Sequence, residues 1–192
     1  MCPVDPGERL HDGFFARSEA GIAWLEATVS DSGSADRRSR VSAIGQSATL
    51  SIGGTPASGL VLGVSIWTAI LDPTFVVAGK TVVPDDNSVK LNLLRAGPFL
   101  DWYPNPRRGY HAFASVGFAA QIELDTKGNP IYPNSKGVTL STGTGYEWFL
   151  SGELSVGFVG RFAVGWLTRT PVNTPERMLF ITPELALTAT YH

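Results

Sequence analysis

Three residues of one segment have side chains that could support hydrolytic chemistry: His111, Ser115 and Glu123. A serine, a histidine and a carboxylate can act as nucleophile, base and orienting group when they lie within hydrogen-bond reach of one another. The segment alternates as a β-strand does, and a strand rises about 3.3 Å per residue. His111 would then lie roughly 13 Å from Ser115 and roughly 40 Å from Glu123. We therefore expect no catalytic site here and no enzyme activity.

Metal and disulfide chemistry are equally poorly supported. The three histidines His11, His111 and His192 are scattered, and no His-x-x-x-His or Cys-x-x-Cys spacing occurs. Cys2 is the single cysteine, which excludes an internal disulfide. We expect no metal and no cofactor.

The segment that carries His111 has the clearest pattern in the chain. Every second residue is apolar: Tyr110, Ala112, Ala114, Val116, Phe118, Ala120, Ile122 and Leu124. The intervening residues are mostly small or polar: His111, Phe113, Ser115, Gly117, Ala119, Gln121 and Glu123. Period-two alternation predicts a strand with two different faces. Its length exceeds the roughly 5–6 residues usual in soluble proteins, and it is typical of a strand that crosses a membrane.

The same alternation recurs along the chain. It predicts eight strands, an even number as bacterial barrels require: 13–29, 41–52, 59–70, 89–103, 110–124, 138–149, 154–168 and 178–192. Pro98 cannot donate a ladder hydrogen bond and predicts a bulge in its strand. The connections alternate between long ones (30–40, 72–88, 125–137, 169–177) and short ones (53–58, 104–109, 150–153). Outer-membrane barrels have long loops outside and short periplasmic turns, which would place both termini on the periplasmic side.

The residue composition of the polar face indicates whether this face points into the barrel or toward the outside. A soluble barrel of the lipocalin kind would face water with Lys, Glu, Asp and Asn, whereas here that face is mostly Gly, Ser, Thr and Ala. Such a face suits the narrow interior of a small barrel. Eight charged residues fall on it, and we expect them to pair across the interior as a polar network: Arg17, Glu19, Arg95, Asp101, Glu123, Glu147, Arg161 and Glu184. The network is interpreted as a plug, and a gated proton or ion path is the alternative.

Aromatic residues gather at the ends of the predicted strands, on the apolar face. Trp67 is the one tryptophan outside this pattern. Two aromatic belts at the two interfaces are typical of a membrane barrel. The residues assigned to the belts are Phe14, Trp24, Trp102, Tyr110, Tyr146, Trp148, Trp166 and Tyr191.

Several motifs resemble those of small eight-stranded outer-membrane proteins of Gram-negative bacteria, the OmpA/OmpX type, and most closely barrels of myxobacteria and related groups. They are His11-Asp12-Gly13-Phe14, Gly53-Gly54-Thr55-Pro56, Gly97-Pro98-Phe99-Leu100-Asp101-Trp102-Tyr103-Pro104, Gly145-Tyr146-Glu147-Trp148 and Thr188-Ala189-Thr190-Tyr191-His192. The resemblance covers residues 11–192 and implies architecture more than function, because members anchor, adhere, confer resistance or conduct. One departure is that Tyr191 is penultimate, whereas the assembly signal usually ends on an aromatic residue.

Together these patterns predict an all-β chain that forms a single closed, up-and-down antiparallel transmembrane β-barrel of about eight strands. The barrel is expected over residues 13–192, and an N-terminal periplasmic extension over residues 1–12. The expected role is structural or surface-interacting, exerted through four long surface loops; the alternatives are a narrow porin-like channel and a soluble ligand-binding barrel.

The expected location is the bacterial outer membrane. The given chain opens without a signal peptide, which we take to have been removed or missed. Expected partners are outer-membrane lipid and lipopolysaccharide, and the barrel assembly machinery during biogenesis, with the chain itself a monomer. The net charge of −2 argues against nucleic acid. The basic run Arg37, Arg38 and Arg40 fits a solvated loop or a contact with anionic lipid.

Overall fold

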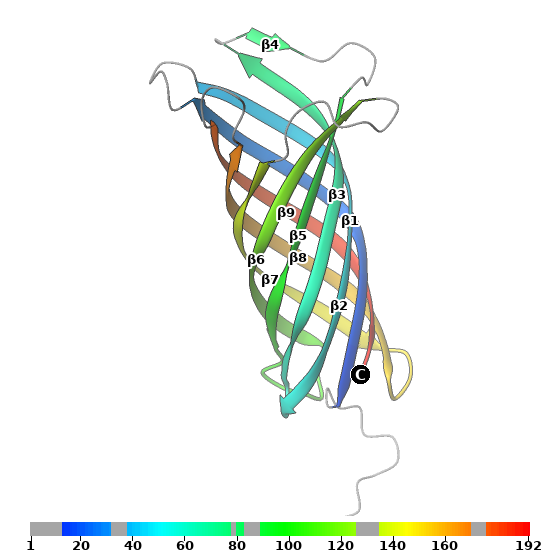
Figure 1. Cartoon of the computed structure of the whole chain (residues 1–192). Helices are drawn as coiled ribbons and strands as arrows, with labels where there is room; N and C mark the ends of the chain where they lie inside the picture. Colours follow the sequence, from blue (N-terminus) through cyan, green and yellow to red (C-terminus); the bar gives the residue numbers. More distant parts are fainter. Residues whose placement is uncertain (1–12, 32–37, 78–79, 83–88, 126–134, 170–175) are drawn as a thin grey trace, which may run out of the picture.

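The computed structural model describes residues 13–31, 38–77, 80–82, 89–125, 135–169 and 176–192. These residues form nine strands: β1 (Phe14–Asp31), β2 (Arg38–Ala57), β3 (Leu60–Val77), β4 (Lys80–Val82), β5 (Val89–Trp102), β6 (Tyr110–Asp125), β7 (Ser135–Phe149), β8 (Leu154–Arg169) and β9 (Glu176–Tyr191). All of the strands except β4 pair antiparallel with both neighbours, and β1 pairs with β9. The sheet therefore closes into an eight-stranded up-and-down barrel, and β4 pairs only with the end of β3 (Figure 1). The expected fold class is confirmed.

The two ends of the barrel differ in their connections. The turn end carries the short links after β2, β5 and β7, together with the start of β1 and the end of β9 (Figure 1). The loop end carries the links after β1, β3, β6 and β8. Because the strands extend into the predicted long loops 30–40 and 169–177, the links after β1 (32–37) and β8 (170–175) are no longer than the link after β5 (103–109). The expected extension over residues 1–12 lies outside the described residues.

Several strand boundaries differ from those expected, and the ends of β2 and β3 differ most. β2 continues through the predicted turn 53–58 as far as Ala57, with a register shift between Gly54 and Ala57. The chain then reverses at Gly59, whose φ of +75° suits glycine. β3 and β4 extend into the predicted loop 72–88, because long hairpins can pair beyond the point where the apolar alternation ends.

Pro98 does not cause the predicted bulge. The ladder between β5 and β6 lacks its Gly97 and Pro98 pairs, yet Ala96 still faces Phe118 and Phe99 still faces Ser115 in one register. The proline therefore interrupts the ladder without shifting it, since only one N–H is lost.

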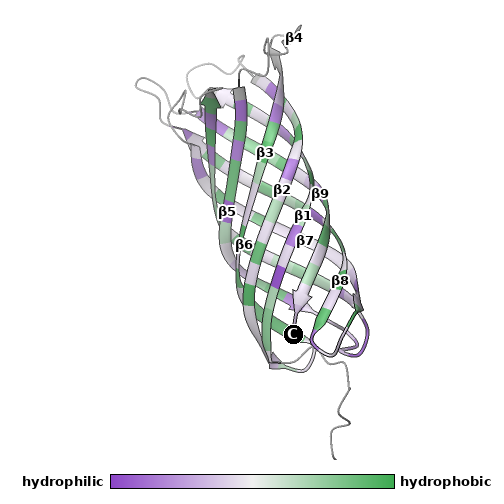
Figure 2. Ribbon diagram, turned by 90° about the vertical axis from the view of Figure 1, so that its right-hand side faces the viewer, coloured by the Kyte–Doolittle hydropathy of each residue, from purple (hydrophilic) through white to green (hydrophobic). Residues whose placement is uncertain are grey.

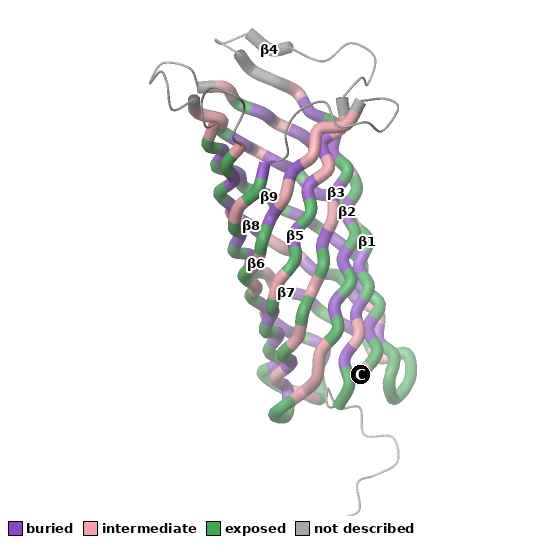
Figure 3. Tube along the Cα trace, in the orientation of Figure 1, coloured by how far each residue is buried: buried purple, intermediate pink, exposed green. Residues whose placement is uncertain are grey.

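Side chains alternate strictly between the outside and the inside of the barrel. Figure 3 shows buried and exposed positions alternating along the strands, and Figure 2 shows the matching alternation in hydropathy. Phe118 is 79% exposed and Leu187 72%, whereas Arg17 is 5% exposed. The apolar face is thus the outer face, as predicted, and the charged residues point inward, which is the reverse of a soluble barrel.

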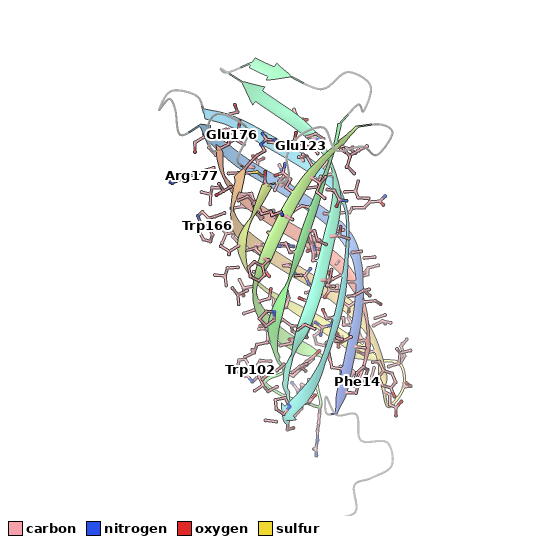
Figure 4. All side chains as sticks on the ribbon, in the orientation of Figure 1. Phe14, Trp102, Glu123, Trp166, Glu176 and Arg177 are labelled. Carbon is pink, nitrogen blue, oxygen red and sulfur yellow. The ribbon has the colours of Figure 1, made fainter. Side chains whose placement is uncertain are left out.

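The outer face is bordered by aromatic side chains at both ends. All eight residues assigned to the belts are exposed. Figure 4 shows Trp166 reaching outward near the loop end, while Trp102 and Phe14 lie near the turn end. Phe14 and Trp24 are ten positions apart on β1, which corresponds to a height of about 25 Å for a strand tilted by about 40°.

The inside is apolar near the loop end. Its residues, which we call the apolar layer, are fully or nearly fully buried and come from β1, β2, β3, β5, β6, β8 and β9: Ala23, Leu25, Ala27, Val41, Ala43, Trp67, Ala69, Leu71, Leu91, Leu93, Ala119, Leu167, Met178 and Phe180. The expectation of a polar interior is therefore wrong for this part of the barrel. The physical reason is that, close to the loops, the inward positions of several strands carry leucine rather than serine or glycine, and these side chains fill the interior by contact with one another.

Candidate functional site

The first group of inward charges surrounds Arg17 near the turn end. Its guanidinium lies 2.7 Å from Asp101 and 3.0 Å from Glu147. It also donates to the Tyr103 hydroxyl at 2.6 Å and, through Nε, to Thr190 at 3.1 Å. These partners come from β5, β7, β9 and the residue that follows β5, so one cation ties together walls that face each other across the interior. We call this group the turn-end network.

Two histidines complete the turn-end network. His111 Nδ1 lies 2.8 Å from Asp101, and its ring stacks on Tyr103 with the centroids 5.0 Å apart. His192 Nε2 lies 3.0 Å from the Ser155 hydroxyl and 3.4 Å from Glu147. Because Glu147 also accepts hydrogen bonds from Ser155 and Thr190, both of its oxygens are used. A buried carboxylate needs such partners.

The second group lies at mid-height and is centred on Arg161. Its two terminal nitrogens reach Glu19 at 2.5 Å and Glu184 at 2.8 Å. Glu184 also accepts from Ser47 at 2.6 Å and from the Trp67 indole at 2.8 Å. We call this group the mid-barrel network.

Arg95 belongs to the same level but is held differently. Its guanidinium lies over the Trp67 ring, 3.6 Å from the centroid, which is a cation–π contact. The nearest carboxylate oxygen is that of Glu184, 3.9 Å from Nη2, which is outside hydrogen-bond distance. Arg95 is only 6% exposed.

A third group forms the rim above the apolar layer. Arg169 pairs with Glu123 at 3.1 Å and with Glu176 at 2.6 Å. Figure 4 shows Glu123 and Glu176 together at the loop end. Because the apolar layer separates this rim from the other two groups, Glu123 does not join the remaining predicted lumen charges.

The eight predicted lumen residues thus divide among three levels. Arg17, Asp101 and Glu147 meet in the turn-end network; Glu19, Arg161 and Glu184, with Arg95 beside them, meet in the mid-barrel network; and Glu123 lies at the rim. Counted over the two inner networks, three arginines face four carboxylates. Each group crosslinks strands that are not adjacent in the sheet.

His111, Ser115 and Glu123 are not brought together. Ser115 shares a hydrogen bond of 2.6 Å with Ser141, whereas His111 pairs with Asp101 and Glu123 with Arg169. Among the described residues, no cluster of three or more His, Cys, Asp or Glu side chains could hold a metal ion. In the same part of the chain, no helix has the length and apolar character to cross a membrane.

Sequence reasoning missed several members of the networks. The predicted set of lumen residues does not include Tyr103, Trp67 or His192, and Arg169 falls in a predicted loop. Strand parity could have found the first two, because Tyr103 and Trp67 share the inward face with Asp101 and Ser65. Parity says nothing of Arg169, whose strand continues past the predicted boundary.

Comparison of the sequence with protein-family profiles and with curated proteins gives no match. Solved structures do match. The outer-membrane protein OprG of Pseudomonas aeruginosa aligns with a TM-score of 0.58 and 11% identity over 96% of this chain and 99% of that one. The Neisserial surface protein A aligns with 0.55 and 15% identity over 93% and 96%.

The outer-membrane protease OmpT of Escherichia coli aligns with a TM-score of 0.51 and 9% identity over 94% of this chain and 96% of that one. Identities this low show the fold alone, so the protease activity is not carried over. The strand closure, the alternation and these likenesses agree: the chain has the fold of the small β-barrels of the Gram-negative outer membrane.

Proposed function

We propose that this chain is a monomeric integral protein of the bacterial outer membrane, which serves as a closed, rigid scaffold for its surface connections. The observation that carries the proposal is the outward apolar face between two aromatic belts, with the arginines and carboxylates of the turn-end and mid-barrel networks buried in the interior. An exterior of this kind is costly in water, and it matches the apolar band about 25 Å tall of membrane barrels.

The interior argues for a scaffold rather than an open pore. The turn-end and mid-barrel networks fill one part of it, and the apolar layer fills the other. A solute would have to displace buried ion pairs and then cross packed leucines. The function is therefore assigned to the connections at the loop end, since loops on rigid scaffolds commonly carry function. Much of these connections lies outside the described residues.

Two measurements test this proposal. The folded protein should require detergent and should migrate faster on a gel when it is not heated. Inserted into a planar bilayer, it should show little or no steady conductance. A monodisperse protein without detergent would contradict membrane residence, and large ohmic channels would favour the porin-like alternative.

The outer rim of the loop end has features that suit anionic lipid. Figure 4 shows Trp166 and Arg177 reaching outward there, and Arg40 is exposed on β2. An aromatic ring at the interface beside cationic side chains can engage lipid headgroups and phosphates. We expect Arg177→Ala to weaken co-purification of lipopolysaccharide with the folded barrel, and Lys90→Ala, whose partner is Asp72, to leave it unchanged. Recognition by the assembly machinery would use β9, which ends at Tyr191.

A further inference from the structure

A cavity lies inside the barrel at the level of Arg95. Its volume is about 40 Å³. A single water requires about 10–15 Å³ on this measure, so the cavity exceeds the space of one water. Residues from seven strands line it, among them Arg17, Glu19, Thr49, Ser65, Arg95 and Arg161.

Arg95, which lines this cavity, carries hydrogen-bond donors that no described residue accepts. Its Nε and Nη1 are buried without a hydrogen-bond partner. Glu184 cannot serve, because its nearer oxygen is 3.9 Å away and already accepts from Trp67 and Arg161. A buried guanidinium without acceptors is costly. An acceptor that is not part of the chain is therefore required.

The charge of the cavity wall indicates what that acceptor is. Three guanidinium groups line the cavity and one carboxylate does. Arg17 and Arg161 have their own carboxylates, and Glu19, the one carboxylate of the wall, is held by Arg161. Ser51, Ser65 and Thr49 add hydroxyl groups, which can rotate to donate. Arg95 is thus the one guanidinium of the wall with no carboxylate in hydrogen-bond distance, and the wall around it is rich in donors.

We propose that this cavity binds one small monovalent inorganic anion, of the size of chloride or bromide, against Nε and Nη1 of Arg95. The Glu19 carboxylate in the wall disfavours a second negative charge, so a singly charged ion fits better than sulfate. The apolar layer lies on one side of the cavity and the turn-end network on the other. This inference stands on the described interior and does not depend on the role of the loops.

The test is to refold the protein in sodium bromide or in sodium gluconate at equal ionic strength and pH, because gluconate is too large for the cavity. Crystals grown from bromide should show an anomalous peak within hydrogen-bond distance of Arg95. The thermal unfolding midpoint should be higher in bromide by roughly 5–10 °C at a hundredfold excess over Kd. A cavity that contains water alone, with equal midpoints in both salts, would overturn the proposal.

Variants separate specific binding from a general salt effect. Arg95→Gln should lose the anomalous peak and the bromide-dependent part of the unfolding midpoint, whereas Arg108→Gln, exposed in the turn between β5 and β6, should keep both. Ser65→Val retains Arg95 but fills part of the cavity, so crystals of this variant should also lack the anomalous peak. This variant tests the site if Arg95→Gln does not fold. A peak that persists in Arg95→Gln would contradict the assigned site.

Discussion

The interior of this barrel is closed by two different chemistries, one at each end. Near the loops, leucines, alanines and Phe180 pack as a small core, and apolar contacts alone hold them. From mid-height to the turns, the charged groups other than Arg95 have specific partners on other strands, as Arg161 has in Glu19 and Glu184. The difference shows that the interior of a narrow barrel can be filled by packed apolar side chains or by buried ion pairs. These two parts of the interior should respond differently to substitution.

The mid-barrel network should be the more easily broken. Arg161→Ala leaves Glu19 and Glu184 buried without their shared cation, and breaking a buried pair costs about 3–5 kcal/mol of unfolding free energy. Arg161→Lys should recover little of this, because one ammonium cannot reproduce the two-sided geometry of the guanidinium. Urea unfolding in detergent or lipid measures the effect. Arg40→Ala, exposed on the outside, should leave the midpoint almost unchanged; a comparable loss in both variants would refute the distinction.

The apolar layer should tolerate changes of shape better than changes of volume. Leu91→Ala removes buried carbons and should lower the unfolding free energy by about 2–5 kcal/mol. Leu91→Met conserves volume and should cost less than about 1.5 kcal/mol. The same unfolding series checks both variants. If Leu91→Met lowered the unfolding free energy as much as Arg161→Lys, the apolar layer and the mid-barrel network would not differ in the way the packing indicates.

The outer face should respond to charge and not to shape. Phe118 is 79% exposed, so Phe118→Arg places a cation against lipid and should cost about 2–4 kcal/mol near the bilayer midplane. Phe118→Leu should be nearly neutral. The difference in unfolding free energy between the two variants should be measured in lipid vesicles, where lipid covers this face. An unchanged unfolding free energy for Phe118→Arg in vesicles would show that the face does not contact the hydrocarbon.

A double-mutant cycle resolves the smallest of these effects. Arg161→Met and Glu19→Gln each remove one partner of a pair 2.5 Å apart. We expect the double variant to be less destabilised than the sum of the singles, with a coupling of about 0.5–3 kcal/mol. Strict additivity of the two unfolding free energies would mean that the pair makes no mutual contribution.

The sequence by itself determined the strands, their alternation and the direction in which the barrel is turned. This is because side chains on a strand repeat every two residues, so a single register assigns a whole segment such as 110–124 to two faces. Long alternating segments with aromatic residues at their ends then indicate lipid outside and a packed interior. Local chemistry was sufficient for these conclusions.

Only the tertiary structure decided which inward residues meet. Arg17 pairs with Asp101 and Glu147 across the interior, although β1 is adjacent to neither β5 nor β7 in the sheet. Strand tilt and closure set the height of each side chain, and neither can be read from one segment. The same geometry brings leucines from separate strands together in the apolar layer. It also places Arg95 beside a cavity, and Arg95 is the one inner arginine with no carboxylate in hydrogen-bond distance.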